Sequence, residues 1–216
     1  MAQNILGLSS EGVDVLNRMY NFMVTHRGLS PEAASAILGN VMQESTFNHN
    51  SVSSKGAKGV YQLLGQNYQN YLNYLKQKSW NDGPLSQTSF VLNEIMNGKD
   101  YYYETYDKYK QRQANGWKER TADGKGWYKN PNDSIEFTKT YLPRELAGTL
   151  PPRREEAVKI ITTSKDIPAI TKMFMDYWER PNQSESNLDK RVEYANLIYS
   201  HFNKRFGGRI NYLKLF

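Results

Sequence analysis

The stretch that decides the fold is SPEAASAILGNVMQES, residues 30–45. Ser30 is a strong N-cap residue, and the proline after it suits the first position of a helix. Apolar residues then recur at helical spacing. Ile37, Val41 and Glu44 fall at i, i+4 and i+7, which places Glu44 within roughly 20° of Ile37 around the helix axis. The helix therefore directs a carboxyl group along the side on which it buries apolar residues.

The position of Glu44 along this helix points to acid–base chemistry. Glu44 lies in the last turn, directly before residues 46–62, which are rich in Asn, Ser and Gly and predict a loop or a short irregular hairpin. A half-buried carboxyl group near the negative end of a helix has its charged form disfavoured. Such a group suits a general acid. The alternative is a glutamate that bends outward to solvent or pairs with Lys55 or Lys58.

The rest of the chain predicts a mainly α protein. Glycine and proline residues separate segments of helical periodicity, and no fixed-period repeat occurs. We expect one domain over residues 1–216, with an aromatic and basic insertion at about 99–133. Helices are expected over residues 9–26, 30–45, 61–78, 84–96, 134–148, 153–163, 167–179 and 188–206.

Composition limits the classes of site. The 28 basic and 22 acidic residues give a net charge of +6, which suits a polyanionic partner or simply keeps the protein soluble. The absence of cysteine excludes disulfides, thiol nucleophiles and thiolate metal sites. We expect no metal site and no cofactor. The first residues lack the pattern of a signal peptide, and no apolar run reaches transmembrane length.

Five short segments, in order, resemble one known family. The pattern is similar to the lysozyme domain of phage tail and endolysin proteins, within the superfamily of goose-type lysozymes and soluble lytic transglycosylases. Residues 99–161 have no counterpart in it. The matching segments are GNVMQESTFN (39–48), GVYQ (59–62), FVLNEIM (90–96), FMDYWERP (174–181) and RVEYA (191–195).

This resemblance implies a fold and an activity. The fold would be a two-lobed, mainly α lysozyme-like domain with at most a small β-hairpin beside the active-site cleft. The activity would be cleavage of the β-1,4 bond between N-acetylmuramic acid and N-acetylglucosamine in peptidoglycan, with Glu44 as the general acid. Tyr61 and Gln62 would line the cleft. Ser45 would orient Glu44 or the backbone, and Ser45 and Asn48 are among the polar residues that would position substrate or water.

The second carboxyl group is less clearly indicated. Glycoside hydrolysis commonly uses two, yet no Asp or Glu occurs between Glu44 and Asp82. Three alternatives remain: a distant residue such as Glu179 or Glu94 folds into the cleft, the substrate's acetamido group assists, or polar residues position water. Glu179 is the preferred candidate. Its structural alternative is an ion pair between helix ends beside the following arginine.

The expected partner is bacterial peptidoglycan. The insertion also suits anionic wall polymers, and other phage tail proteins are further candidates. We expect neither nucleic-acid binding nor membrane insertion. The protein would act from the virion tail or after release from the host cytoplasm. The rival hypotheses are a lytic transglycosylase that acts on the same bond, a non-catalytic wall-binding or tail structural module, and a basic nucleic-acid binder.

Overall fold

The computed structural model describes residues 6–98, 150–179 and 187–205, with single positions at 107, 110, 111 and 114. The chain divides into two compact units, Met1–Asn97 with Arg154–Phe216, and Gly98–Arg153. All elements below belong to the first unit. The helix expected at 134–148 and nearly all of the insertion expected at about 99–133 lie outside the described residues.

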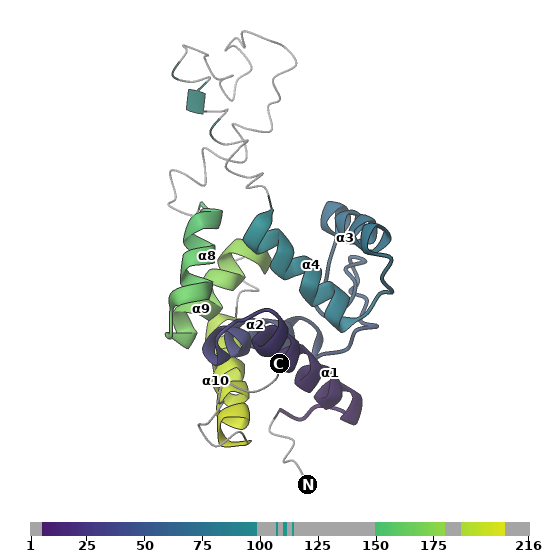
Figure 1. Ribbon diagram of the computed structural model, residues 1–216, viewed down its shortest axis with the longest axis vertical. Coiled ribbons are helices and arrows are strands. Elements are labelled where there is room, and N and C mark those ends of the chain that lie inside the picture. The colour runs from purple at the N-terminus through teal and green to yellow at the C-terminus, as the bar shows by residue number, and fades with distance from the viewer. Residues whose placement is uncertain are drawn as a thin grey trace. The chain divides into compact units, whose positions relative to one another are not determined.

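The first unit is helical, as predicted (Figure 1). Within the described residues, β structure is limited to the isolated bridges Val52↔Lys58 and Lys58↔Leu63. The elements are α1 Ser10–Asn21, η1 Phe22–His26, α2 Pro31–Ser45, α3 Gly65–Lys78, α4 Pro84–Asn97, α8 Arg154–Thr163, α9 Ile167–Phe174, η2 Met175–Glu179 and α10 Leu188–Arg205.

The helix predicted over 61–78 starts later than expected, at Gly65. The preceding residues form a turn instead, because Gln62 adopts a positive φ of 47° and cannot begin a right-handed helix. Leu63 exchanges two backbone hydrogen bonds with Lys58, at 3.0 and 2.9 Å. The helices predicted over 9–26 and 167–179 have the expected extents, but each ends in a π-helical turn, η1 and η2.

α2 is the central helix and is enclosed on all sides. Every residue from Ala33 to Met42 is buried, and the helix packs against α9 and α10 (Figure 1). Small residues make the close packing with α10 possible. A Cβ on Gly39 would lie 2.6 Å from the Arg191 carbonyl oxygen and 2.7 Å from the Ala195 Cβ. The two backbones therefore approach each other at Gly39 as only glycine allows.

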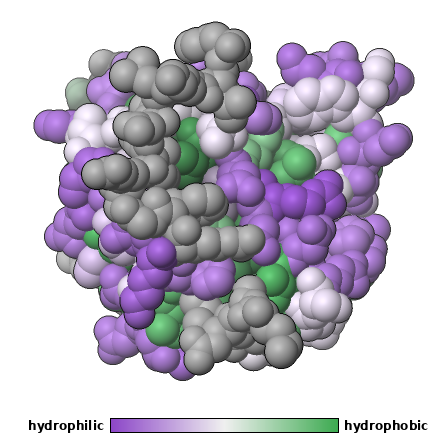
Figure 2. Space-filling model, turned by 60° about the horizontal axis from the view of Figure 1, so that its bottom comes forward, coloured by the Kyte–Doolittle hydropathy of each residue, from purple (hydrophilic) through white to green (hydrophobic). Residues whose placement is uncertain are grey.

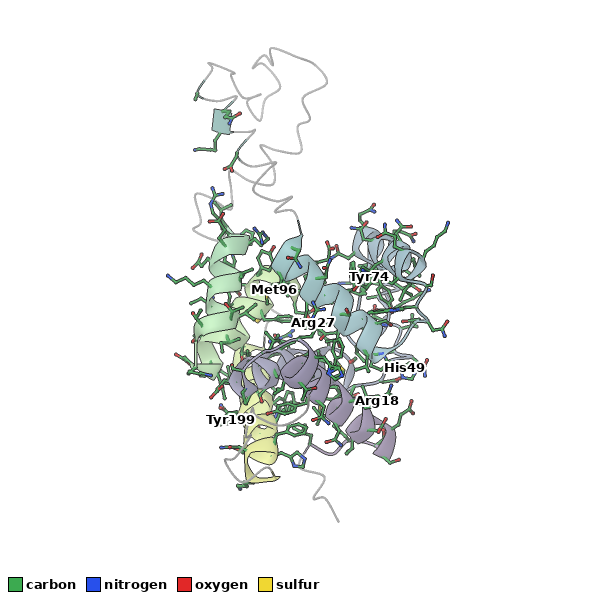
Figure 3. The ribbon with its side chains drawn as sticks, viewed as in Figure 1. Arg18, Arg27, His49, Tyr74, Met96 and Tyr199 are labelled. Atoms are coloured by element: carbon green, nitrogen blue, oxygen red, sulfur yellow. The ribbon has the colours of Figure 1, made fainter. Side chains whose placement is uncertain are left out.

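Other contacts fix the surrounding helices. The rings of Tyr20 and Phe202 stack with centroids 3.7 Å apart, which joins α1 to α10. Arg154 Nη1 donates to the Met96 carbonyl at 2.9 Å and ties α8 to the end of α4. Figure 3 labels Met96 on α4. The face shown in Figure 2 is mostly hydrophilic, with separate hydrophobic areas. Among the described residues, no helix combines the length and apolar character needed to cross a membrane.

Candidate active site

A pocket of about 400 Å³ lies where the end of α2, the loop before α3 and η2 meet. Polar, aromatic and aliphatic side chains share its wall with two carboxyl groups. The lining residues are Glu44, Ser53, Lys55, Ala57, Tyr61, Gln62, Leu63, Leu64, Asn67, Trp178 and Glu179. Glu44 and Glu179, separated by most of the chain, therefore open onto one pocket.

Glu44 is partnered by an arginine from α10. Arg191 is 1% exposed, and its Nη2 donates to Glu44 Oε1 at 2.5 Å. The Glu44 side chain keeps 22% of its surface exposed. An adjacent guanidinium favours the ionised form of a carboxyl group. The sequence did not predict this contact, because it suggested a lysine such as Lys55 or Lys58 as the cationic partner.

The carboxyl group of Glu179 has a different environment from that of Glu44. It ends η2, a π-helical turn of a kind often found at functional sites. Its Oε1 is enclosed, and no hydrogen-bond partner occurs for it within the described part of the chain. Burial raises the pKa of the Glu179 carboxyl well above its ordinary value, and the neighbouring Glu44 charge raises it further. The Arg191 guanidinium acts in the other direction but does not reverse the shift.

The two carboxyl groups thus lie in different environments. Glu44 is hydrogen-bonded to the buried Arg191 guanidinium, whereas burial raises the pKa of Glu179 well above its ordinary value. Two carboxyl groups in unlike environments can supply an acid and an anion at the same pH. The arrangement is chemically suited to general acid–base work on a bond held in the pocket.

Two of the predicted substrate-binding residues line this pocket. Tyr61 is 2% exposed, its hydroxyl donates to Thr88 Oγ1 at 3.4 Å, and burial raises the pKa of that hydroxyl. Gln62 donates through Nε2 to the Gly59 carbonyl at 2.8 Å. Both residues belong to the turn that replaces the first part of the predicted helix. Their side chains are therefore placed by the loop and not by α3.

Two other predicted residues lie elsewhere. Ser45 is buried, does not line the pocket, and donates through Oγ to the Val60 carbonyl at 2.9 Å. Asn48 is exposed, and its Oδ1 accepts a hydrogen bond from the Asn50 amide at 3.0 Å. Ser45 thus joins the helix that carries Glu44 to the pocket loop. Glu94, the other candidate for the second carboxyl group, is also outside the pocket lining.

The loop is held from a second side by α4. Gln87 is 1% exposed, its Oε1 accepts from the Val60 amide at 2.9 Å, and its Nε2 donates to Asp82 Oδ1 at 3.1 Å. A Cβ on Gly59 would come within 2.2 Å of the Gln87 amide group. The backbone amide of Val60 is therefore bound by Gln87, and its backbone carbonyl by Ser45. This fixes the backbone next to Tyr61.

Among the residues of this site that the sequence did not predict are Arg191, Trp178 and Asn40, which binds the arginine. A signal for each was present, because all three lie inside segments that carry the family resemblance. The segments gave no indication of what each residue contacts. Among the described residues, no group of acidic, histidine or cysteine side chains is placed to hold a metal ion.

Comparison with known proteins identifies a family that matches most of the chain. The family described as phage tail lysozyme matches residues 14–202, a span that includes α2, the pocket loop, η2 and most of α10. The search of curated proteins found no match, and the search of solved structures found none either.

Proposed function

Because this chain belongs to the phage tail lysozyme family, we propose that it cleaves the β-1,4 bond between N-acetylmuramic acid and N-acetylglucosamine. Family membership makes it a phage-associated, cell-wall lytic enzyme with peptidoglycan as its substrate class. The particular bond and the residues that act on it are our proposal. The observation that carries the proposal is the opening of Glu44 and Glu179 onto one pocket.

The reaction requires a proton for the leaving oxygen and a negative charge for the sugar or the attacking water. The sequence suggested Glu44 as the donor. We propose Glu179 as the donor instead and Glu44 as the anion, because burial raises the pKa of Glu179 whereas Glu44 is paired with the Arg191 guanidinium. In this scheme the protonated carboxyl group donates to the leaving oxygen, while the carboxylate stabilises the oxocarbenium-like charge on the sugar or activates water.

The rest of the pocket supports a sugar ligand. Trp178 offers an amphipathic ring of the kind that packs against a sugar face. Gln62, Asn67 and Ser53 offer amide and hydroxyl groups that bind sugar hydroxyls and acetamido groups. The pocket accordingly combines the apolar and polar contacts that a glycan strand requires. We further propose that the protein works either from the virion tail or after release from the host cytoplasm to the cell wall.

The decisive test is clearing of peptidoglycan sacculi by the wild type and by three matched variants. Glu44→Gln and Glu179→Gln each remove one ionisable group from the pocket and should abolish clearing. Glu94→Gln is the control, because Glu94 is also partly buried with a raised pKa but lies outside the pocket. Full clearing by Glu44→Gln would refute the proposal. Binding of sacculi without clearing by the wild type would favour a wall-binding module.

The products separate hydrolysis from transglycosylation. Mass spectrometry of the released muropeptides should show reducing N-acetylmuramic acid ends if water completes the reaction. An anhydro-muramyl product would instead identify a lytic transglycosylase, which needs no activated water. The muropeptides also identify the bond, because cleavage on the other side of the disaccharide leaves a reducing N-acetylglucosamine end.

A further inference from the structure

We propose that Arg191, held in place by Asn40, is a positioning residue that keeps Glu44 charged and oriented, so that Glu44 and Glu179 carry one proton between them. The inference rests on the proposed function, because the two carboxyl groups act in catalysis only if the protein cleaves peptidoglycan. The number of protons that the pair holds is a property of the folded protein and can be measured without activity.

Asn40 is oriented by its own contacts. It is fully buried in the middle of α2, and its Nδ2 donates to the Ala36 carbonyl at 3.0 Å and to the Thr171 carbonyl at 3.2 Å. With both carbonyls accepting, the amide nitrogen must face them, and the amide oxygen is left for a donor. Asn40 Oδ1 accepts from Arg191 Nη1 at 3.1 Å. The asparagine therefore connects α2, α9 and α10 at one point.

Arg191 uses the two arms of its guanidinium for different partners. Nη1 donates to Asn40, and Nη2 donates to Glu44 Oε1 at 2.5 Å. The guanidinium is planar and rigid, so fixing one arm fixes the direction of the other. The backbone of Arg191 is itself held against Gly39, where a Cβ would lie 2.6 Å from the Arg191 carbonyl oxygen. The backbone and the guanidinium of Arg191 are therefore both fixed relative to α2.

Charge balance leads from this geometry to a single proton. Arg191 is buried and positively charged, which is unfavourable without a negative partner. Glu44 supplies one negative charge. A second charge on Glu179 would lie on a carboxyl group whose enclosed Oε1 has no hydrogen-bond partner among the described residues, with the like charge of Glu44 beside it. Lys55 also lines the pocket, but it is exposed and its charge is screened by solvent. Among the described residues, the buried arginine and the two carboxyl groups are therefore balanced when one of the carboxyl groups is protonated.

The test compares Arg191→Gln with Arg191→Lys. Glutamine removes the charge, whereas lysine keeps the charge but loses the planar fork. Lytic rate is measured from pH 4 to pH 9, with folding at each pH checked by circular dichroism. The carboxyl groups of both variants and of the wild type are also titrated by carbon NMR, which does not require activity.

For Arg191→Gln we expect the limbs of the pH profile and the titration of the pair to move to higher pH by about one unit or more, because an opposite charge has been lost. For Arg191→Lys we expect a lower rate with both limbs within a few tenths of a unit of the wild type. A purely structural arginine would instead lower the rates of both variants and leave both profiles in place, which overturns the inference.

A second variant covers the case in which Arg191→Gln does not fold. Asn40→Asp keeps the arginine but places a competing negative charge on it, and the pair should again titrate at higher pH. The wild type also gives a result by itself, since loss of both protons in one step near an ordinary glutamate pKa of about 4.3 contradicts a shared proton. If the titrations behave as expected and no variant or wild type clears sacculi, the proposed function fails and the inference stands.

Discussion

The close crossing of α2 and α10 at Gly39 predicts by how much an alanine at this position would destabilise the protein. In Gly39→Ala the new Cβ would lie 2.6 Å from the Arg191 carbonyl oxygen, 2.7 Å from the Ala195 Cβ and 2.8 Å from the Ala195 amide nitrogen. These atoms are backbone or Cβ atoms, so no side chain can rotate away. α10 must move by roughly 1 Å to restore a carbon contact of about 3.5 Å.

The size of the effect follows from two opposing terms. Overpacking a well-filled core costs about 1–3 kcal/mol. Alanine is a better helix former than glycine by about 1 kcal/mol, which offsets part of that cost. Because the contacts are rigid, we expect a net loss of about 1–2 kcal/mol in the free energy of unfolding. The displaced α10 also moves Arg191, so lytic activity should fall at temperatures where the variant is still folded.

Urea unfolding at neutral pH measures the change, with Gly12→Ala as the matched control. Gly12 is also a buried helical glycine, but a Cβ there meets its nearest neighbours at 3.4 Å, an ordinary contact. We expect Gly12→Ala to be at least as stable as the wild type. A Gly39→Ala protein as stable as Gly12→Ala and fully active would refute the account of the helix crossing and of the arginine it positions.

Three further predictions use other contacts. The first uses an aryl glycoside of N-acetylmuramic acid, whose leaving group needs no proton. On this substrate Glu179→Gln should keep more activity than Glu44→Gln, measured by release of the aryl group. The reverse ranking would return the donor role to Glu44. The second concerns stability, because the raised pKa of Glu179 means that the folded state binds this proton more tightly than the unfolded state. Ionisation of Glu179 therefore destabilises the fold progressively as pH rises from about 4.5 through the raised pKa. Glu179→Gln should therefore gain stability over the wild type at pH 8 but not at pH 4, and equal gains in thermal melts at both pH values would contradict this. Gln87→Ala leaves the buried Val60 amide without its acceptor and should cost about 1–3 kcal/mol in urea unfolding, whereas an unchanged midpoint would show that the loop does not depend on that bond.

Local signals in the sequence were sufficient for most of the secondary structure. Ser30 caps α2 as predicted, its Oγ accepting from the Ala33 amide at 3.1 Å, and the expected helices over 84–96, 153–163 and 188–206 are present as far as they are described. The error at the start of α3 has a local cause. The residues with helical spacing, Tyr68, Tyr71, Leu72 and Leu75, do lie in α3, but the bridge between Lys58 and Leu63 replaces the first turn that was expected from Tyr61.

The sequence by itself determined that Glu44 ends a buried helix before a polar loop, because capping and periodicity depend on residues a few positions apart. It also carried the ordered segments that placed the chain among phage lysozymes. Only the tertiary structure decided which charges surround Glu44. Arg191 and Glu179 lie more than 130 residues further along the chain, and no local pattern encodes their distance from α2. The electrostatics of the pocket arise where α2, η2 and α10 meet, because charge interactions depend on separation in space and on burial.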